Sequence, residues 1–268
     1  DPLWSRGLGD VYKRQIKWDM NRSMTDRFSQ ALPAERQGEL CHRYVLGFYK
    51  LMEKLTTTFP QIRFEGCCGG GGRFDMGVLY YAPQIWCSDD TDAIERIGIQ
   101  HGTSFFYPPS VMGAHVSVCP NQQTGRSVSI DTRAALAYYG TFGYELDPGE
   151  LSAKEKEAVK RQIQYYQEHA LTSAFGKYYR LTGVGDEFVA FMSVADDQKS
   201  AVFSFVQRRT SANKGIIYIK LRGLNESAIY TIPELGLELS GASLMYAGLP
   251  MPVIKADNTA KTFTLIQK

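Results

Sequence analysis

The sequence predicts two parts of different fold class, an α/β region followed by an all-β domain. From Ile16 to about Leu181, short apolar runs alternate with longer amphipathic stretches, which is typical of parallel βα units. Polar or acidic residues end several of these runs, and this favours a (β/α) barrel or a doubly wound sheet with its site on that face. After Gly183-Val184-Gly185 the helical period disappears, and short strands separated by turn residues remain.

Five runs in the α/β region are predicted to be buried strands. They are IKWDMN (16–21), IRFEGC (62–67), QIWCSD (84–89), GAHVSVCP (113–120) and TFGYELD (141–147). Five strands are too few to close an eight-stranded barrel. We therefore expect the C-terminal portion of a (β/α)8 TIM barrel, about five βα units, with roughly the first three units missing.

Helices are predicted between and after these strands, over residues 35–58, 92–102, 129–139 and 152–179. The first carries apolar residues at three- and four-residue spacings, which defines an amphipathic face. Ser152 followed by Glu155 is a capping-box pattern, and it predicts where the last helix begins.

Six further runs predict an antiparallel β-sandwich domain at the C-terminus: EFVAFMSV, KSAVFSFVQR, GIIYIKLRGL, SAIYTIPE, ASLMYAG and TFTLIQK. The predicted domains are therefore residues 16–182 for the barrel part and 183–268 for the all-β part. Residues 1–15 show neither a helical nor a strand period. We interpret them as a non-native leader, with a genuine disordered N-terminus as the alternative.

The charge balance gives no electrostatic reason to expect nucleic acid or a membrane surface as partner. The 268 residues include 30 Lys and Arg against 28 Asp and Glu, a net charge of +2, so a neutral ligand fits at least as well. The five cysteines are odd in number and contain no C-x-x-C pair, which argues against a disulfide framework and a zinc site. We expect a cytoplasmic protein with no metal or other cofactor.

Asp19 ends the first predicted strand and follows Lys17 and Trp18. By the strand period of two, Lys17 and Asp19 share one side of the strand and Trp18 points the other way. A carboxylate, a cation and an aromatic ring are thus presented where a sugar could bind. Retaining glycoside hydrolysis needs two carboxylates about 5 to 5.5 Å apart, and Asp19 is a candidate for one of them. From this segment alone, a Lys-Asp surface pair on a strand edge is the alternative.

The segment WCSDDTDAIER offers the second carboxylate. Asp90, Thr91 and Asp92 precede a predicted helix, where Asp and Thr are ordinary N-cap residues, so we expect at least one of them to cap it. Asp89 lies nearest the strand end and is therefore the candidate that faces a pocket.

The run EGCCGGGGRFD lacks the Lys-Ser/Thr of a Walker motif, which argues against nucleotide binding. A glycine run directly after a strand suits close approach of the backbone to a ligand, and a flexible loop is the alternative. No histidine lies at ligand spacing from Cys67 or Cys68, so no metal site is predicted there.

Several long motifs follow one another along the first part of the chain: IKWDMNR, ERQGELCHRYVLGFYKLMEKL, FEGCCGGGGRFDMGVLYYAPQIWCSDDTDAIERI, IQHGTSFFYPPSVMGAHVSVCPNQQTGR and FGYELD. Together they resemble glycoside hydrolase family 36, the α-galactosidases. The later LRGLNESAIYTI and SGASLMYAGLPMP resemble the family's C-terminal β-domain. The resemblance implies an N-terminal β-sandwich, a central (β/α)8 barrel and a C-terminal sandwich, so this chain would be a C-terminal fragment that begins at about the fourth barrel strand.

The resemblance also implies roles for individual residues. The Asp of K-W-D, Asp19, corresponds to the nucleophile, and the first Asp of S-D-x-x-D, Asp89, corresponds to the general acid/base. Cys68 stands where serine is common and Gln122 where histidine is usual, but neither change removes a catalytic carboxylate. Five residues are implied to bind substrate: Lys17, Asn21, Cys67, Gly69 and Trp86.

The implied activity is hydrolysis, with retention and by double displacement, of terminal α-D-galactosyl residues of oligosaccharides such as melibiose and raffinose. A galactosyl transglycosylase and an α-N-acetylgalactosaminidase of the same fold are alternatives within glycoside chemistry. A carbohydrate-binding protein without catalysis is the alternative from another class. We expect this truncated chain to be inactive alone, and the resemblance implies that the full-length protein is a homo-oligomer, for example a tetramer.

Overall fold

The computed structural model describes residues 14–19, 25–185, 187–213 and 215–268. All but the last two residues of the predicted leader, and Asn21 among the predicted substrate contacts, lie outside these ranges. The chain divides into two compact units, one that ends at Asp89 and one that runs from Asp90 to Lys268.

The first unit is a three-stranded parallel sheet with two α-helices. Its strand order is β1-β2-β3, and both neighbouring pairs are parallel. The core joins Met52 of the long helix to Phe64 and Ile85 of the sheet. The elements are β1 (Gln15–Asp19), η2 (Ala34–Glu39), α1 (Leu40–Thr58), β2 (Arg63–Cys67), α2 (Met76–Tyr81) and β3 (Gln84–Ile85).

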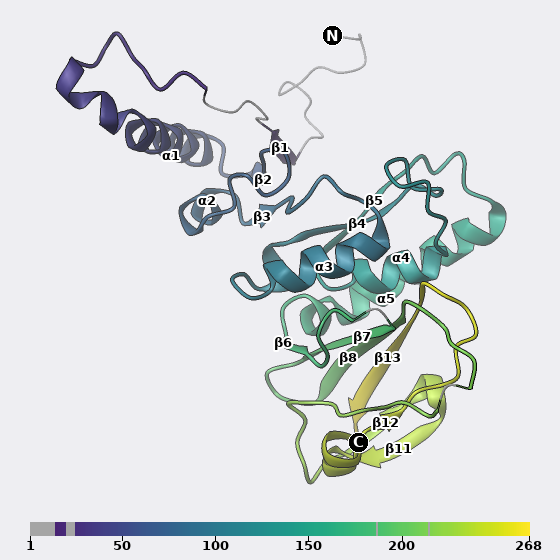
Figure 1. Ribbon diagram of the computed structural model, residues 1–268. Helices are drawn as coiled ribbons and strands as arrows, with labels where there is room; N and C mark the ends of the chain where they lie inside the picture. The colour runs from purple at the N-terminus through teal and green to yellow at the C-terminus, as the bar shows by residue number, and fades with distance from the viewer. Residues whose placement is uncertain (1–13, 20–24, 186, 214) are drawn as a thin grey trace. The chain divides into compact units, whose positions relative to one another are not determined.

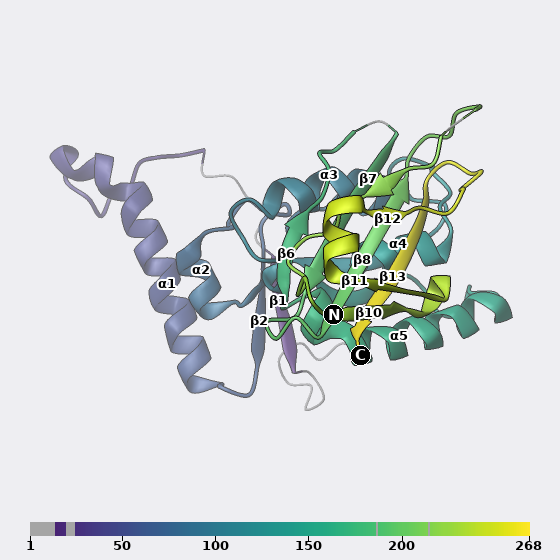
Figure 2. The ribbon, with the colours of Figure 1, turned by 90° about the horizontal axis from the view of Figure 1, so that it is seen from below.

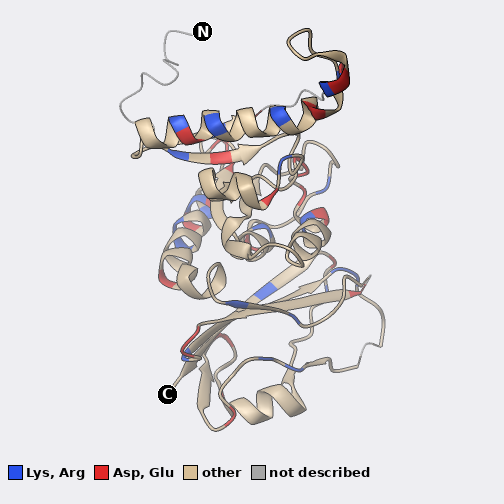
Figure 3. Cartoon of the chain, turned by 90° about the vertical axis from the view of Figure 1, so that its left-hand side faces the viewer, with Lys and Arg blue, Asp and Glu red and all other residues tan. Residues whose placement is uncertain are grey.

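The predicted helix 35–58 is present as the 3-10 turn η2 followed by α1. The charged residues along α1 are mostly basic, with Glu53 between Lys50 and Lys54 near its C-terminal end (Figure 3), and Glu39 lies 2.8 Å from both Arg36 and Arg43 at the start of the helix. The short helix α2 was not predicted. Asp75 starts it by accepting a hydrogen bond from the backbone N–H of Val78, and Tyr49 donates to the same carboxylate at 2.6 Å.

The second unit begins with alternating strands and helices and continues into an antiparallel sheet. The parallel pair β4 and β5 is the fourth and fifth predicted strand. Side-chain N-caps start the three helices, at Asp92, Ser129 and Ser152. The elements are α3 (Ala93–Thr103), η3 (Pro109–Val111), β4 (Gly113–Ser117), α4 (Ile130–Ala137), β5 (Thr141–Glu145) and α5 (Ala153–Ser173).

The antiparallel part is a six-stranded sheet with order β11-β10-β13-β8-β7-β6, accompanied by the two-stranded sheet β12-β9. Helices α4 and α5 cover one face of the large sheet, and the segment with β12 and η5 covers the other (Figures 1 and 2). The strands are β6 (Lys177–Arg180), β7 (Phe188–Val194), β8 (Ser200–Gln207), β9 (Tyr218–Ile219), β10 (Ile229–Ile232), β11 (Leu237–Ser240), β12 (Leu249–Pro250) and β13 (Thr259–Gln267), with short helical turns η4 (Pro233–Leu235) and η5 (Ser243–Ala247).

The sequence prediction of βα units followed by an antiparallel sheet is confirmed, and the Ser152–Glu155 capping box is present. Two element predictions are wrong. The last helix ends at Ser173, not at 179, because the next residues form β6 on the edge of the large sheet, paired with β7. The run ASLMYAG is not a strand but the π-helical turn η5.

Candidate active site

The parallel register of β1 and β2 places Asp19 directly beside Cys67. In the same register Lys17 lies beside Glu65. Because side chains alternate along a strand, these four side chains share one face of the sheet. Trp18 points to the other face, where its ring centroid lies 6.4 Å from those of Phe48 and Phe64. The period of two therefore predicts the face of the first strand correctly.

The Cys67 side chain is a buried thiol in contact with the Asp19 carboxylate. It is 2% exposed. Burial raises its pKa to about 11; a hydrogen bond from the Gly70 backbone and the charge of Lys17 act in the opposite direction, and the hydrogen bond to Asp19 and the charge of Asp19 raise it further. The thiol is consequently protonated at neutral pH and acts as a hydrogen-bond donor to Asp19.

Trp86 supports the Lys17 side chain and is itself buried. The Lys17 Nζ lies 4.8 Å from the centroid of the Trp86 ring, within range of a cation–π interaction. Trp86 is 3% exposed, and its backbone N–H donates to the Gly66 carbonyl at 2.9 Å. The structure thus brings together four of the predicted site residues: Lys17, Asp19, Cys67 and Trp86.

The glycine run after β2 forms a hydrogen-bonded turn. The Gly72 N–H donates to the Cys68 carbonyl at 3.1 Å, and the Phe74 N–H donates to the Gly71 carbonyl at 3.1 Å. Gly69 and Gly70 have φ of +54° and +76°, values that favour glycine. Gly69 is exposed, and an added Cβ would meet nothing within 4 Å, so its backbone is open to a ligand.

Asp89 lies four residues beyond the end of β3, at the same sheet edge as Asp19. The two strands are separated by β2, which corresponds to about 10 Å at the usual strand spacing. Two Asp side chains that lean toward each other from such positions can approach the roughly 5.5 Å that a retaining pair needs. Both residues are exposed. A closed barrel would surround them with further strands.

Asp92 is the helix cap that the sequence leads us to expect among Asp90, Thr91 and Asp92. Its carboxylate accepts from the backbone N–H groups of Ile94 at 2.8 Å and Glu95 at 3.4 Å. Burial acts to raise its pKa, but hydrogen bonds from Thr124, from the Ile94 backbone and from Arg126 outweigh burial and hold the pKa below its usual value. These contacts leave Asp92 in a structural role.

Glu65 is a site-facing carboxylate that the sequence analysis did not single out. It is 5% exposed and accepts a hydrogen bond from the Gln15 side chain at 2.9 Å. Its position two residues before Cys67 was the available signal, because residues two apart on a strand face the same way.

Across the described part of the chain, no three His, Cys, Asp or Glu side chains cluster as a metal site would require. None of the helices in this part combines the length and apolar character of a membrane span. The cysteines are free thiols: Cys41, Cys67, Cys68, Cys87 and Cys119.

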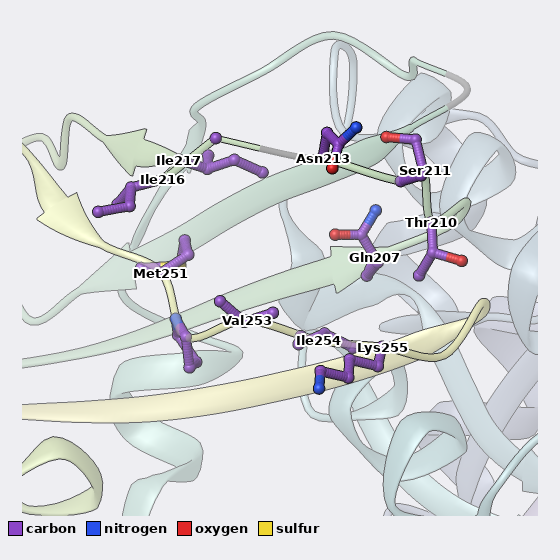
Figure 4. A pocket seen from close by; sticks show the side chains of 13 residues that line it. Gln207, Thr210, Ser211, Asn213, Ile216, Ile217, Met251, Val253, Ile254 and Lys255 are labelled. Carbon is purple, nitrogen blue, oxygen red and sulfur yellow. The ribbon is translucent and has the colours of Figure 1, made fainter.

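A cavity of about 490 Å³ lies in the second unit and is lined by none of the predicted site residues. Its walls come from the segments 207–217 and 251–255 (Figure 4). Apolar Ile217 and Met251 face polar Gln207 and Thr210 across it. The chemistry predicted from the sequence therefore belongs to the open sheet edge of the first unit and not to this cavity.

Two family models match the chain. The Melibiase model matches residues 6–176, and the model of the glycosyl hydrolase family 36 C-terminal domain matches residues 188–265. Together they cover the parallel strands and most of the antiparallel sheet described above.

The chain is also similar to curated α-galactosidases. It is 48% identical over 253 residues to the bifunctional alpha-galactosidase/sucrose kinase AgaSK of Mediterraneibacter gnavus, a match that covers 94% of the chain and 26% of the relative. It is 48% identical over 244 residues to alpha-galactosidase AgaA of Geobacillus stearothermophilus, covering 90% of the chain and 33% of the relative. The chain thus spans about a third or less of the length of these relatives.

Solved structures agree with this similarity. The crystal structure of AgaA from Geobacillus stearothermophilus superposes with a TM-score of 0.92 at 45% identity, over 95% of this chain and 36% of that one. Variants of AgaA were solved in complex with raffinose and with stachyose, with TM-scores of 0.92 and 0.91. In each case 95% of this chain and 35% of the other chain are covered.

Proposed function

This chain belongs to glycosyl hydrolase family 36, and we propose that it carries the two catalytic carboxylates of a retaining α-galactosidase. Asp19 is the nucleophile and Asp89 the general acid/base. The observation that carries the proposal is the parallel register that sets Asp19 beside the Cys67 thiol, with Lys17 on the same face of β1 and Asp89 beyond β3 at the same end of the sheet.

The first half-reaction forms a covalent intermediate. The ionised Asp19 carboxylate attacks the anomeric carbon of the galactosyl residue, and the bond from that carbon to the leaving oxygen breaks. Asp89 gives its proton to the leaving oxygen. The products of this step are a galactosyl ester on Asp19, a released alcohol or sugar, and an ionised Asp89.

The second half-reaction restores the enzyme. The Asp89 carboxylate takes a proton from water while the water oxygen attacks the anomeric carbon and the ester bond to Asp19 breaks. Galactose is released, Asp19 is again a carboxylate and Asp89 again carries a proton. Two inversions at one carbon give net retention of the α configuration.

The other proposed site residues assist through contact with Asp19 or the sugar. The Cys67 thiol donates to the Asp19 carboxylate and so supports the ionised form that attacks. Lys17 presents a positive charge on the same face. We propose the open backbone at Gly69 and the residue Asn21 as sugar contacts, whereas Trp86 reaches the sugar only through Lys17, because its ring is buried against that side chain.

Terminal α-galactosyl residues of oligosaccharides such as melibiose and raffinose are the proposed substrates. The AgaA structures with raffinose and stachyose support this choice, because those complexes involve a relative of the same fold at 44% and 45% identity. We propose that the complete protein is a homo-oligomer and that the free cysteines suit a cytoplasmic location.

The test uses the chain completed with the portion that precedes it in the relatives. The completed protein should hydrolyse 4-nitrophenyl α-galactoside, and Asp19→Ala should abolish turnover. Azide should restore product release from Asp19→Ala with inverted configuration, because azide then replaces the missing nucleophile. Asp196→Ala, an exposed Asp in the turn between β7 and β8, is the matched control and should retain activity.

If the completed protein does not hydrolyse α-galactosides but cleaves another α-glycoside, the proposed substrate is overturned and the assignment of the two carboxylates stands. The 268-residue chain alone should be inactive, because its described residues supply five parallel strands and leave both carboxylates exposed. Full turnover by the chain alone would overturn that part of the proposal.

A further inference from the structure

The four glycines after β2 have different surroundings, although the sequence presents them as one run. Gly69 is exposed and open, whereas Gly70 is buried. A Cβ on Gly72 would meet the Cys68 carbonyl oxygen at 2.5 Å, so Gly72 permits the turn itself. The remaining two glycines are both less exposed than Gly69, because Gly70 is buried and Gly71 is half-buried.

Gly70 and Gly71 lie against the backbone of the segment that ends in Asp89. A Cβ on Gly70 would lie 2.6 Å from the Ser88 Cα and 3.0 Å from the Asp89 nitrogen. A Cβ on Gly71 would lie 3.0 Å from the Cys87 carbonyl oxygen. These neighbours are backbone atoms, which cannot swing aside as a flexible side chain can, so any side chain at position 70 must displace Ser88 and Asp89.

The glycine loop, residues 67–72, is connected at its other end to Asp19. It begins at Cys67, which is paired in register with Asp19 and donates to its carboxylate. The Cys68 N–H donates to the Gly70 carbonyl at 3.0 Å, which ties Gly70 to the start of the loop. The loop is thus a spacer with Asp19 at one end and the Asp89 backbone at the other.

We infer that Gly70 is a positioning residue for the general acid/base: its missing side chain lets the loop seat Ser88 and Asp89 at the distance from Asp19 that proton donation requires. This inference rests on the proposed function. Gly70 touches no reacting atom. Its effect passes entirely through Asp89, and a displacement of about 1 Å at a catalytic group can reduce the rate on the order of 10²-fold.

The test compares two substrates that differ in their need for an acid. Methyl α-galactoside has an alkoxide leaving group that must be protonated, whereas 4-nitrophenyl α-galactoside has a phenolate that leaves largely without help. In the completed protein, kcat/KM is measured on both substrates for the wild type, Gly70→Ala and Asp89→Ala. The ratio of the two values is independent of how much of a variant is folded, because active concentration cancels.

Gly70→Ala should lower kcat/KM on methyl α-galactoside by about 10² or more and on 4-nitrophenyl α-galactoside by less than about tenfold. Its ratio should therefore move toward that of Asp89→Ala. Gly236→Ala is the matched control, because Gly236 also has a positive φ, +62°, but an added Cβ would meet nothing within 4 Å. That variant should keep the wild-type ratio and activity.

An active wild type with an unchanged ratio in Gly70→Ala would overturn the inference and leave the proposed function standing. An unchanged ratio in Asp89→Ala would overturn both the acid/base assignment and the inference. A completed wild type silent on both substrates would overturn the proposed function, and the inference would fall with it.

Discussion

The Cys67 thiol offers a direct test of the site geometry, because its reactivity depends on burial and on its contact with Asp19. The pKa of about 11 leaves a thiolate fraction of about 10⁻³ at pH 8, whereas an ordinary cysteine, with a pKa near 8.5, has about a quarter. Alkylation proceeds through the thiolate, and the greater nucleophilicity of a thiolate of higher pKa offsets part of this difference, so Cys67 should react on the order of tenfold more slowly than an exposed cysteine from its pKa alone. Its 2% exposure slows the reaction further.

The assay is alkylation of the folded completed protein with iodoacetamide at pH 8, followed over time by peptide mass spectrometry. Cys41 and Cys119 are exposed and serve as internal controls in the same sample. Fragmentation of the peptide that contains Cys67 and Cys68 separates the two adjacent thiols.

The Asp19→Asn variant isolates the contribution of the carboxylate. Burial is the largest cause of the raised pKa of Cys67, and the hydrogen bond to Asp19 and its negative charge add to it. Removing that charge should therefore lower the pKa of the Cys67 thiol and increase its rate of labelling. The rate should still be well below the labelling rate of Cys41. Labelling of wild-type Cys67 as fast as Cys41 would refute the buried geometry, and identical slow labelling in Asp19→Asn would refute the contact.

Three further predictions concern the capping of helices and the support of Lys17. Asp92→Ala should destabilise α3 by about 2 to 4 kcal/mol, because it removes the helix cap and a buried partner of Arg126. Hydrogen exchange of the backbone amides of residues 93–103 measures this loss. The pKa of Asp92 is lowered on folding, so the stabilisation by its carboxylate is present above the unfolded pKa of about 3.9 and is lost as the pH falls through the folded pKa. If Asp92→Ala loses as much stability relative to the wild type at pH 2 as at neutral pH, this reasoning is contradicted. Trp86→Leu should reduce kcat/KM about tenfold, given a cation–π interaction of about 1 to 2 kcal/mol, with partial recovery in Trp86→Phe; equal losses in both variants would count against a role for the ring. Ser152→Ala should destabilise α5 by about 1 kcal/mol in urea unfolding, and Ser227→Ala, in an exposed turn, should not.

The parts of the fold that were predicted correctly are those set by local chemistry. The five parallel strands follow from short apolar runs, and the starts of α3, α4 and α5 follow from side chains that cap the first free N–H groups. The errors occur where a distant segment decides the outcome. Residues 177–180 continue a helical pattern but pair with β7, and the carbonyl of Leu244 in η5 accepts from the N–H of Leu221.

For the site, the chemical groups present and the strand face that they share follow from the sequence alone. The period of two places Lys17 and Asp19 together, and the motif resemblance named both carboxylates as candidates. The residues that stand opposite them could not be predicted, because strand register joins segments almost fifty residues apart and leaves no local signal in the sequence. That register sets Cys67 against Asp19, and the folded loop makes Gly70, among four identical neighbours, the one that lies against Asp89.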